Sequence, residues 1–240
     1  MLGDCMSYKK KRKKVIGVLL WTVLLCGTLL LFHEPLKNFL VSLGITGIGM
    51  DKLSSEDIKE GNNKDASFDF DEVQELDLKT ILMANLNKKD ITIIGGISIP
   101  SVNLNLPIGK GTSKYTLALT AGTMKEEQAM GEGNYALAGH HMKRGDLLFS
   151  PLYDVEEGAA IYLTDLDYIY EYQIDEQRYI EATDVEVIDD IEGKTMITLI
   201  TCDDDGEDRF LIRGHFLKKT PIDEAEKEVR NAFKLQVNNK

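Results

Sequence analysis

Residues 195–216 read TMITLITCDDDGEDRFLIRGHF, which is two runs rich in β-branched and aromatic residues separated by an acidic loop. Such residues favour extended strands, and Asp and Gly favour the turns that connect strands. We therefore expect two neighbouring strands joined by this loop. Cys202, which ends the first run, would then lie on the strand adjacent to the one that Arg209 opens.

Six more runs of the same kind precede this pair, each bounded by Gly, Pro, Asn or Asp. They are ITIIGGISI (91–99), VNLNLPI (102–108), NYALAG (134–139), AAIYLTDL (159–166), YIYEYQI (168–174) and RYIEATDVEVI (178–188). Only residues 112–130 and 147–155 between them have a helical or irregular pattern. Strands therefore do not alternate regularly with helices, and we predict an all-β domain, a closed or nearly closed antiparallel barrel of eight strands with short helices.

The N-terminus joins a basic segment to an uncharged one. Residues 9–14 are all Lys or Arg, and residues 15–32 (VIGVLLWTVLLCGTLLLF) carry no charge. As a helix, this uncharged stretch would extend ~27 Å, close to the ~30 Å of a bilayer's hydrocarbon core. We predict a transmembrane helix at 15–32, with the basic tail 1–14 in the cytoplasm and everything after the helix outside the cell.

Two other interpretations of the apolar stretch are disfavoured. A cleaved signal peptide usually has a shorter apolar run and a small-residue cleavage site, whereas this run ends in Leu31 and Phe32. A lipoprotein signal needs small residues before its cysteine, whereas bulky Leu24 and Leu25 precede Cys26. We therefore expect a retained single-pass anchor in the cell membrane.

Composition divides the rest of the chain. Residues 33–66 mix glycines with polar residues without a sustained period and are predicted to be an extracellular tether. Residues 67–220 would form the folded domain, and 221–240 a C-terminal helix or tail. Within 69–86, Val73, Leu76, Ile81 and Leu82 recur at helical spacing and predict a helix at the edge of the domain, with a semi-ordered spacer as the alternative.

Charge and cysteine content exclude several classes of protein. The chain has 28 Lys and Arg against 40 Asp and Glu, for a net charge of −12, which repels a nucleic acid backbone. Its 3 cysteines are scattered, without CxxC spacing. The sequence therefore offers neither a disulfide framework nor a four-ligand zinc site.

Cys202 is the strongest candidate for reactive chemistry. A lone cysteine is usually a small buried hydrophobe. This one, however, sits where a strand gives way to an acidic loop, and a free thiol on an oxidising surface is a hazard without a use. A nucleophilic thiolate needs a cationic neighbour, an acid for the leaving group and donors for the oxyanion. Arg209 and His140, which follows the run NYALAG, are the candidates for these roles.

The other histidines are weaker candidates. His141 follows His140, and adjacent residues of an extended chain point in opposite directions, so only one of the two can face Cys202. His215, in the last run, is expected to be structural. A metal site built from His140, His141 and Cys202 lacks a further convergent ligand, and we predict none.

Three stretches of the chain resemble the class A sortases, which are membrane-anchored cysteine transpeptidases of Gram-positive bacteria. They are NYALAGH (134–140), LLFSPL (147–152) and TLITC (198–202), the last followed by Arg209. The resemblance covers about residues 91–217, and the anchor and tether fit it as well. TLITC with an arginine on the next strand is its specific part, since Ala-Gly-His alone would be weak.

The resemblance implies an eight-stranded sortase-type β-barrel that acts on a C-terminal sorting signal of the LPxTG type. Cys202 would attack the threonine carbonyl and form a thioester, which an amino group of a peptidoglycan precursor such as lipid II would resolve. His140 would be the acid/base, and Arg209 would donate to the oxyanion or the substrate backbone. The partners would be surface proteins that bear the signal and the peptidoglycan precursor. Catalysis would then take place outside the membrane.

The resemblance also implies roles for three residues around the substrate. Ala138 and Ile200 match positions that line an apolar groove for the Leu-Pro part of the signal. Thr201, directly before the cysteine, matches a residue that shapes the oxyanion site.

Calcium is where the sequence departs from some members of this family, which bind an activating ion through acids in two loops. Lys125 and Gln128 stand where such acids would be, and only Glu132 is retained. Hard cations need several carboxylate oxygens, so we predict no cofactor and no calcium activation. Lys125 would instead pair with an acid of the loop before TLITC.

Two alternatives to a sortase remain. One is a catalytically silent, membrane-anchored extracellular binding domain in which Cys202 is merely buried. The other is a different cysteine enzyme. However, the Ser-His-Gly-Cys arrangement of L,D-transpeptidases is absent, and papain-like enzymes place the cysteine before the histidine, whereas His140 precedes Cys202.

Overall fold

The computed structural model describes residues 2–48, 50–69, 76–143, 146–202 and 208–233. The chain divides into two compact units, one ending at Phe39 and the other beginning at Leu40. The first unit consists of one helix, α1 (Leu2–Ile48), which continues into the second unit.

The predicted anchor lies in α1. Among the described residues no single straight helix is both long and apolar enough to cross a membrane, but the segments Lys14–Thr28 and Leu31–Ile48 pass the test together as a pair bent by 47°. Pro35 lies inside α1, where it cannot donate the helical hydrogen bond to the carbonyl four residues before it, a common cause of helix bending. The transmembrane helix at 15–32 therefore stays a prediction.

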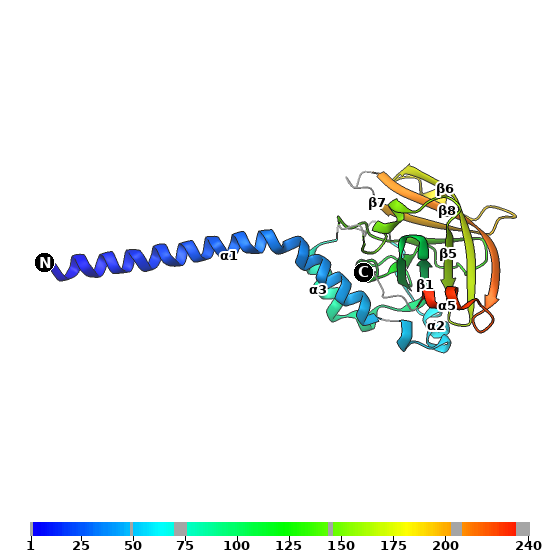
Figure 1. The fold of residues 1–240 in the computed structure, drawn as a ribbon, viewed down its shortest axis with the longest axis horizontal. Helices are drawn as coiled ribbons and strands as arrows, with labels where there is room; N and C mark the ends of the chain where they lie inside the picture. Colours follow the sequence, from blue (N-terminus) through cyan, green and yellow to red (C-terminus); the bar gives the residue numbers. More distant parts are fainter. Residues whose placement is uncertain (1, 49, 70–75, 144–145, 203–207, 234–240) are drawn as a thin grey trace. The chain divides into compact units, whose positions relative to one another are not determined.

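The second unit is a closed barrel of eight strands, as predicted (Figure 1). The strands are β1 (Ile93–Ile99), β2 (Leu104–Gly109), β3 (Ala121–Thr123), β4 (Asn134–Ala138), β5 (Ala160–Thr164), β6 (Tyr168–Glu181), β7 (Met196–Cys202) and β8 (Asp208–Pro221). Around the barrel they follow the order β1-β2-β3-β4-β7-β8-β6-β5, and β5 pairs back with β1. Closure leaves the sheet without a free edge.

Two details of the predicted barrel were wrong. The pairs β2–β3 and β4–β7 are parallel, so the barrel is mixed rather than antiparallel. The eight strands are also not the eight runs of the sequence, because residues 168–181 form one long strand, β6, and residues 185–188 form a 3-10 turn, η6 (Val185–Ile188). β6 continues through the polar residues 175–177 because β8 pairs along its whole length, with an irregular register near Ile174. The eighth strand, β3, comes from the segment expected to be helical or irregular.

Short helices fill the connections. They are η1 (Met50–Lys52), α2 (Ser55–Asn62), α3 (Leu78–Leu86), η3 (Lys88–Asp90), η4 (Pro100–Val102), α4 (Lys114–Leu119), η5 (Ser150–Asp154) and α5 (Lys227–Ala232). Side-chain caps explain where three of them begin, since Ser54, Asp77 and Ser113 each accept a hydrogen bond from a backbone N–H three residues later.

Residues 33–66, predicted to be a tether, are largely helical, and those after Phe39 belong to the barrel unit. Val41 and Ile45 are fully buried in the core, and Ile58 of α2 is also buried. The sequence did not predict this, because a pair of apolar residues at 41 and 45 extends over too few turns to make a sustained helical period. The helix expected over 69–86 begins at Leu78, and Val73 lies outside the described residues.

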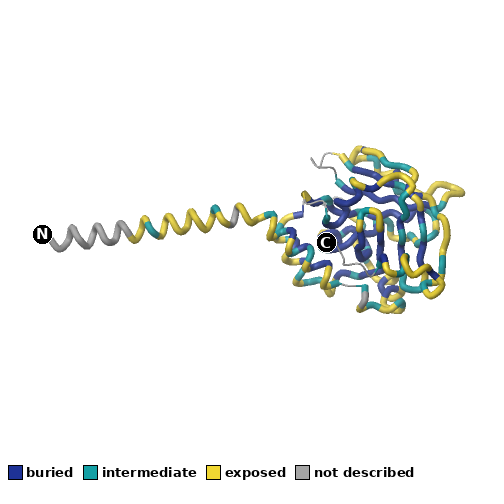
Figure 2. The backbone as a smooth tube through the Cα atoms, in the orientation of Figure 1, coloured by how far each residue is buried: buried dark blue, intermediate teal, exposed yellow. Residues whose placement is uncertain are grey.

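The core fills the inside of the barrel. In Figure 2, long stretches of the barrel unit are coloured dark blue, which marks buried residues. Side chains alternate along β7, so that Ile197 and Leu199 belong to this core while Ile200 points to the outer face. There Ile200 joins a second, smaller group of buried residues, which we call the outer cluster. Its members are Ile180, Val187, Ile200 and Leu211, with Met124 and Ile188 packed against them.

Candidate active site

The thiol and the arginine singled out in the sequence lie side by side. β7 and β8 are antiparallel, and Cys202 is the direct register partner of Arg209. Leu199, three residues before Cys202, and Phe210, directly after Arg209, both face the core. Because successive side chains of a strand point to opposite faces, Cys202 and Arg209 both lie on the outer face of the barrel. Cys202 is partly exposed, and Arg209 is also accessible at this end of the sheet.

His140 reaches the same level from the other side of β7. β4 and β7 are parallel, with Ala138 opposite Ile200. The pairing continues beyond the strand, because the N–H of Gly139 donates to the carbonyl of Ile200 at 3.1 Å. The following residue, His140, is therefore level with Cys202, and it is 7% exposed.

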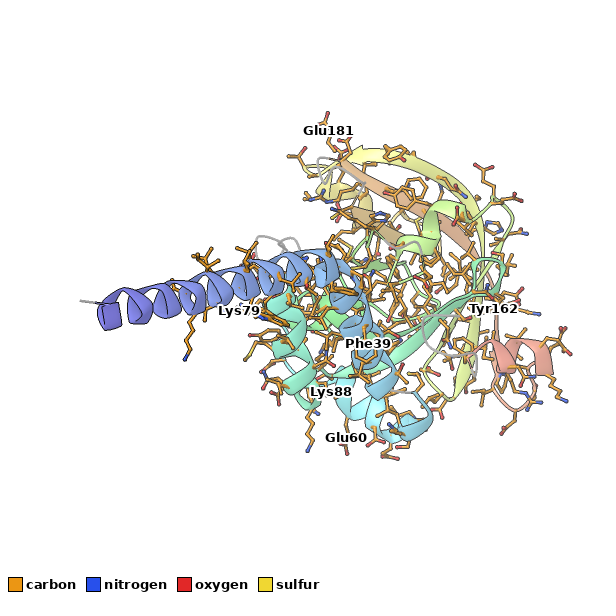
Figure 3. The ribbon with its side chains drawn as sticks, turned by 60° about the vertical axis from the view of Figure 1, so that its left-hand side comes forward. Phe39, Glu60, Lys79, Lys88, Tyr162 and Glu181 are labelled. Atoms are coloured by element: carbon orange, nitrogen blue, oxygen red, sulfur yellow. The ribbon has the colours of Figure 1, made fainter. Side chains whose placement is uncertain are left out.

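Three neighbouring strands thus bring His140, Cys202 and Arg209 to one end of the barrel, on its outer face. Glu181, labelled in Figure 3, marks this end, since it pairs with Asp208 next to Arg209. An imidazole on one side of a thiol and a guanidinium on the other is the arrangement that can stabilise a thiolate, protonate a leaving group and bind an oxyanion.

A close approach behind His140 explains the glycine that precedes it. A Cβ added to Gly139 would lie 2.5 Å from the ring of Phe149. The N–H of Phe149 in turn donates to the carbonyl of His140 at 3.1 Å. The aromatic ring therefore fills the space that a side chain at position 139 would need, and the same residue fixes the backbone of the histidine.

Tyr153 is a residue of this site that the sequence reasoning missed. Its hydroxyl donates to the carbonyl of Cys202 at 2.8 Å, and its ring stacks on Phe210 with centroids 4.7 Å apart. His141 contacts the same ring edge-on at 4.9 Å. Of the two adjacent histidines, His141 thus packs on the aromatic residue that holds the backbone of Cys202. The only signal for Tyr153 was its place just after LLFSPL.

The residues expected to bind substrate lie around Cys202 on both faces of β7. Ala138 and Ile200 are register partners on the outer face, and Ile200 is part of the outer cluster. Thr201 instead pairs with the inward-facing Phe210 and is 2% exposed. Within the described part of the chain, its hydroxyl is buried without a hydrogen-bond partner.

A buried polar network on the outer face holds η6 against the barrel. Asn134 donates to the carbonyls of Val187 and Asp189, each at 3.1 Å. It accepts from the hydroxyl of Thr198 at 2.8 Å. Arg213 adds a hydrogen bond to the carbonyl of Val187 at 2.9 Å. Sequence reasoning missed this network because its members are ordinary polar residues of separate strands.

The carboxylate that completes this network is Glu176, which pairs with Arg213 at 2.9 Å and Arg178 at 2.7 Å. Burial alone would raise the pKa of Glu176, but the two guanidinium groups outweigh it and lower that pKa below its ordinary value. The carboxylate therefore stays charged to a lower pH than an ordinary glutamate does.

Lys125 holds the loop between η6 and β7 to the sheet through Asp190. Its ammonium lies 2.6 Å from Asp190, which also accepts a hydrogen bond from the N–H of Asn134 at 2.8 Å. Hydrogen bonds from Lys125 and then from Asn134 hold the pKa of Asp190 below its usual value. The sequence prediction that Lys125 pairs with an acid of the loop before TLITC is thus confirmed.

These residues do not fit a calcium ion. Lys125 places a cation where the ion would need a ligand, and the amide of Gln128 hydrogen-bonds both backbone groups of Ala136. Glu132 is exposed. Among the described residues, no group of three His, Cys, Asp or Glu side chains could hold a metal ion.

Comparison with known proteins agrees with this geometry. A family model described as the sortase domain matches residues 97–217, about half of the 240 residues. The chain belongs to the sortase family. It is 40% identical to sortase A of Listeria monocytogenes over 92% of this chain and 97% of that protein. It is 34% identical to sortase A of Streptococcus agalactiae, with 97% and 98% covered.

A solved structure agrees with these relatives. The sortase A structure from L. monocytogenes has a TM-score of 0.55 and 42% identity, and the match covers 62% of this chain and 99% of that one. A sortase C-3 from Streptococcus pneumoniae, 18% identical, shares the fold with a TM-score of 0.56. This sortase is therefore a sortase A-type transpeptidase, an enzyme that anchors surface proteins.

We predict that Gly139→Ala both destabilises this sortase and lowers its activity. The added methyl group must displace the ring of Phe149, which should cost about 1–3 kcal/mol and shift the backbone of His140. Thermal unfolding and peptide cleavage measure the two effects. Gly193→Ala is the control for an added methyl group without a clash, since nothing lies within 4 Å of its Cβ; its φ of 75° costs some stability, but its activity should be kept. Full activity of Gly139→Ala would contradict the close packing.

We predict that Asp190→Ala loosens η6 and destabilises the folded state by about 1 kcal/mol, because an N–H of the sheet loses its acceptor. The folded pKa of Asp190 is depressed below 3.8, so its contribution to stability is present above that pH and is lost as the pH falls through the folded value. The difference between Asp190→Ala and wild type in urea unfolding should therefore vanish in strong acid. A difference that persists there would contradict the ion pair.

Proposed function

We propose that this sortase cleaves an LPxTG-type sorting signal between Thr and Gly and transfers the acyl group to an amine of a peptidoglycan precursor such as lipid II. The observation that carries this proposal is the strand register that sets Cys202 between His140 and Arg209. Family membership supports acyl transfer from surface proteins, while the exact signal and acceptor are part of the proposal.

The thiolate of Cys202 attacks the threonine carbonyl carbon and forms a tetrahedral intermediate. When this collapses, the bond to glycine breaks, and the imidazolium of His140 gives its proton to the departing amine. The thioester is then attacked by the acceptor amine, which returns a proton to His140 as the Cys202 thiolate leaves. One imidazole thus acts first as acid and then as base.

Arg209 supplies fixed positive charge to this reaction. A guanidinium stays protonated at any relevant pH, so it acts as a hydrogen-bond donor rather than as a proton carrier. Its Nη1 donates to the carbonyl of Asp208 at 2.9 Å, and a guanidinium carries five N–H donors, which suits it chemically to donate to an oxyanion or to the substrate backbone. Its position opposite Cys202 supports this role.

The outer face beside Cys202 supports an apolar subsite. Ala138 precedes His140 by two residues, and Ile200 precedes Cys202 by two residues. Met124 and Ile188 pack against the outer cluster. We assign the Leu-Pro part of the signal to this surface. Thr201 would act from the opposite face of β7, through the position of the backbone next to Cys202.

The N-terminal segment supports action at the cell membrane. Residues 1–14 would remain in the cytoplasm, residues 15–32 would span the bilayer, and the barrel would lie outside. This single-pass topology would place the thiol on the side where surface proteins and peptidoglycan precursors meet.

We predict that the full chain incubated with an LPxTG peptide forms a thioester on Cys202, detected by intact mass and removed by hydroxylamine. Cys202→Ala should form no adduct. His140→Ala and Arg209→Ala should each lower the rate of cleavage at least ~100-fold, since each removes a group used in the transition state. His141→Ala is the matched control for His140, and its loss should stay below ~10-fold. Equal losses in both histidine variants, or full activity in Arg209→Ala, would contradict the assignment.

We predict that EDTA leaves transpeptidation unchanged. The position that a cation would occupy between the two loops is already served by Lys125 and Asp190. The rate of transfer to a soluble amine should be the same in EDTA and in millimolar calcium. A several-fold loss in EDTA that calcium restores would contradict this ion pair as the substitute for a metal.

A further inference from the structure

Helix α3 is apolar on two sides, and within the described part of the chain only one of them is buried. Ile81 and Ala84 are fully buried in the core. Leu82, Met83 and Leu86 lie on the opposite side of the helix and are 43%, 36% and 77% exposed. A surface helix normally has a polar outer face, so the second apolar side indicates a further apolar neighbour.

Lysines lie near both ends of this face in an acidic protein. Residues 77–90 contain Lys79, Lys88 and Lys89 against Asp77 and Asp90, which gives them a net charge of +1, whereas the whole chain has −12. Lys79 and Lys88 bracket α3 on the side of the barrel unit away from the strands (Figure 3). An apolar helix face flanked by lysines is the pattern of helices that lie in a membrane interface.

The chain itself keeps α3 close to the predicted bilayer. The side chain of Asn85, in α3, donates to the carbonyl of Leu40 at 3.0 Å. Leu40 follows Phe32, the last residue of the uncharged stretch, by only eight residues. Those residues extend ~12 Å as a helix and at most ~28 Å fully stretched. However the two units are oriented, α3 cannot lie far from the lipid surface.

This attachment is tight. A Cβ at Gly44, four residues after Leu40, would meet Leu119 of α4 and the amide of Asn85, with its Oδ1 at 2.9 Å. Close packing of this kind requires glycine on one side and fixes the distance between the two segments. The segment that leaves the predicted anchor is therefore bound directly to α3.

We propose that the exposed face of α3 binds the outer lipid surface of the membrane, a proposal that rests on the anchor in the proposed function. Leu82, Met83 and Leu86 enter the boundary between headgroups and acyl chains. Lys79 and Lys89 lie at the level of the lipid phosphates and favour anionic lipid. The barrel then has two attachments to the bilayer, the anchor and α3, which fixes its orientation.

This orientation suits the candidate active site. In Figure 3, Glu181 marks the end of the barrel that carries Cys202 and is well separated from Lys79 and Lys88. With α3 on the lipid, that end is held at a set height above the membrane.

Tryptophan fluorescence of the full chain in vesicles tests this proposal. Trp21 is the only tryptophan, so a Trp21→Phe background carrying Leu86→Trp reports on α3 alone. In vesicles of phosphatidylcholine and phosphatidylglycerol, lipids brominated just below the headgroup should quench this residue by about half and shift its emission to the blue. Phosphatidylcholine alone should quench less, because the lysines lose their anionic partners.

Leu217→Trp in the same background is the matched control, since Leu217 is an exposed leucine of β8 at 46% and should remain unquenched. The wild-type chain tests the anchor separately, through quenching of Trp21. Quenching of Trp21 without quenching at position 86 would overturn the lipid contact and leave the proposed function intact. A blue shift at position 86 without quenching would also overturn it, in favour of a protein neighbour such as a second copy. An unquenched Trp21 would overturn the anchor and the lipid contact together.

Discussion

The parallel pairing of β4 with β7 is the constraint on which the site depends. The histidine and the cysteine are 62 residues apart in the chain (202 − 140), and they meet only because two parallel strands end at the same level. Parallel strands need a long connection, and here that connection carries β5 and β6, two of the eight strands. The position of the histidine relative to the cysteine therefore depends on how this part of the barrel is built.

A second layer of interactions supports this pairing from the outer face. Asn134 opens β4 and bonds to η6, Thr198 lies opposite Ala136 in β7, and Arg213 reaches across from β8. These polar groups are buried or, for Arg213, partly buried, and they are paired with one another, which makes any displaced arrangement costly. The apolar outer cluster continues the same surface up to Cys202. The face that would receive substrate is thus fixed by contacts among three strands and one loop.

The sequence predicted closure of the barrel and the pairing of β7 with β8 from local patterns, whereas its total of eight strands agreed only because dividing β6 offset the missing β3. It could not predict the parallel pairs, which depend on contacts distant in the chain. It divided β6 at Asp175 because polar residues end a strand by local rules, whereas pairing with β8 continues it. Cys202, His140 and Arg209 were accessible to sequence reasoning because each sits at a strand end. Tyr153 was not, since a tyrosine in a 3-10 turn carries no signal of the backbone carbonyl that it binds.

The ammonium of Lys125 has a consequence for where such an enzyme can work. A divalent ion shared by two loops obeys mass action, so the ordered fraction of the loops rises and falls with the ion's concentration in the medium. A covalently attached cation is always present at one per molecule and cannot be diluted away. The link between Lys125 and the loop that carries Asp190 consequently does not depend on the supply of divalent ions.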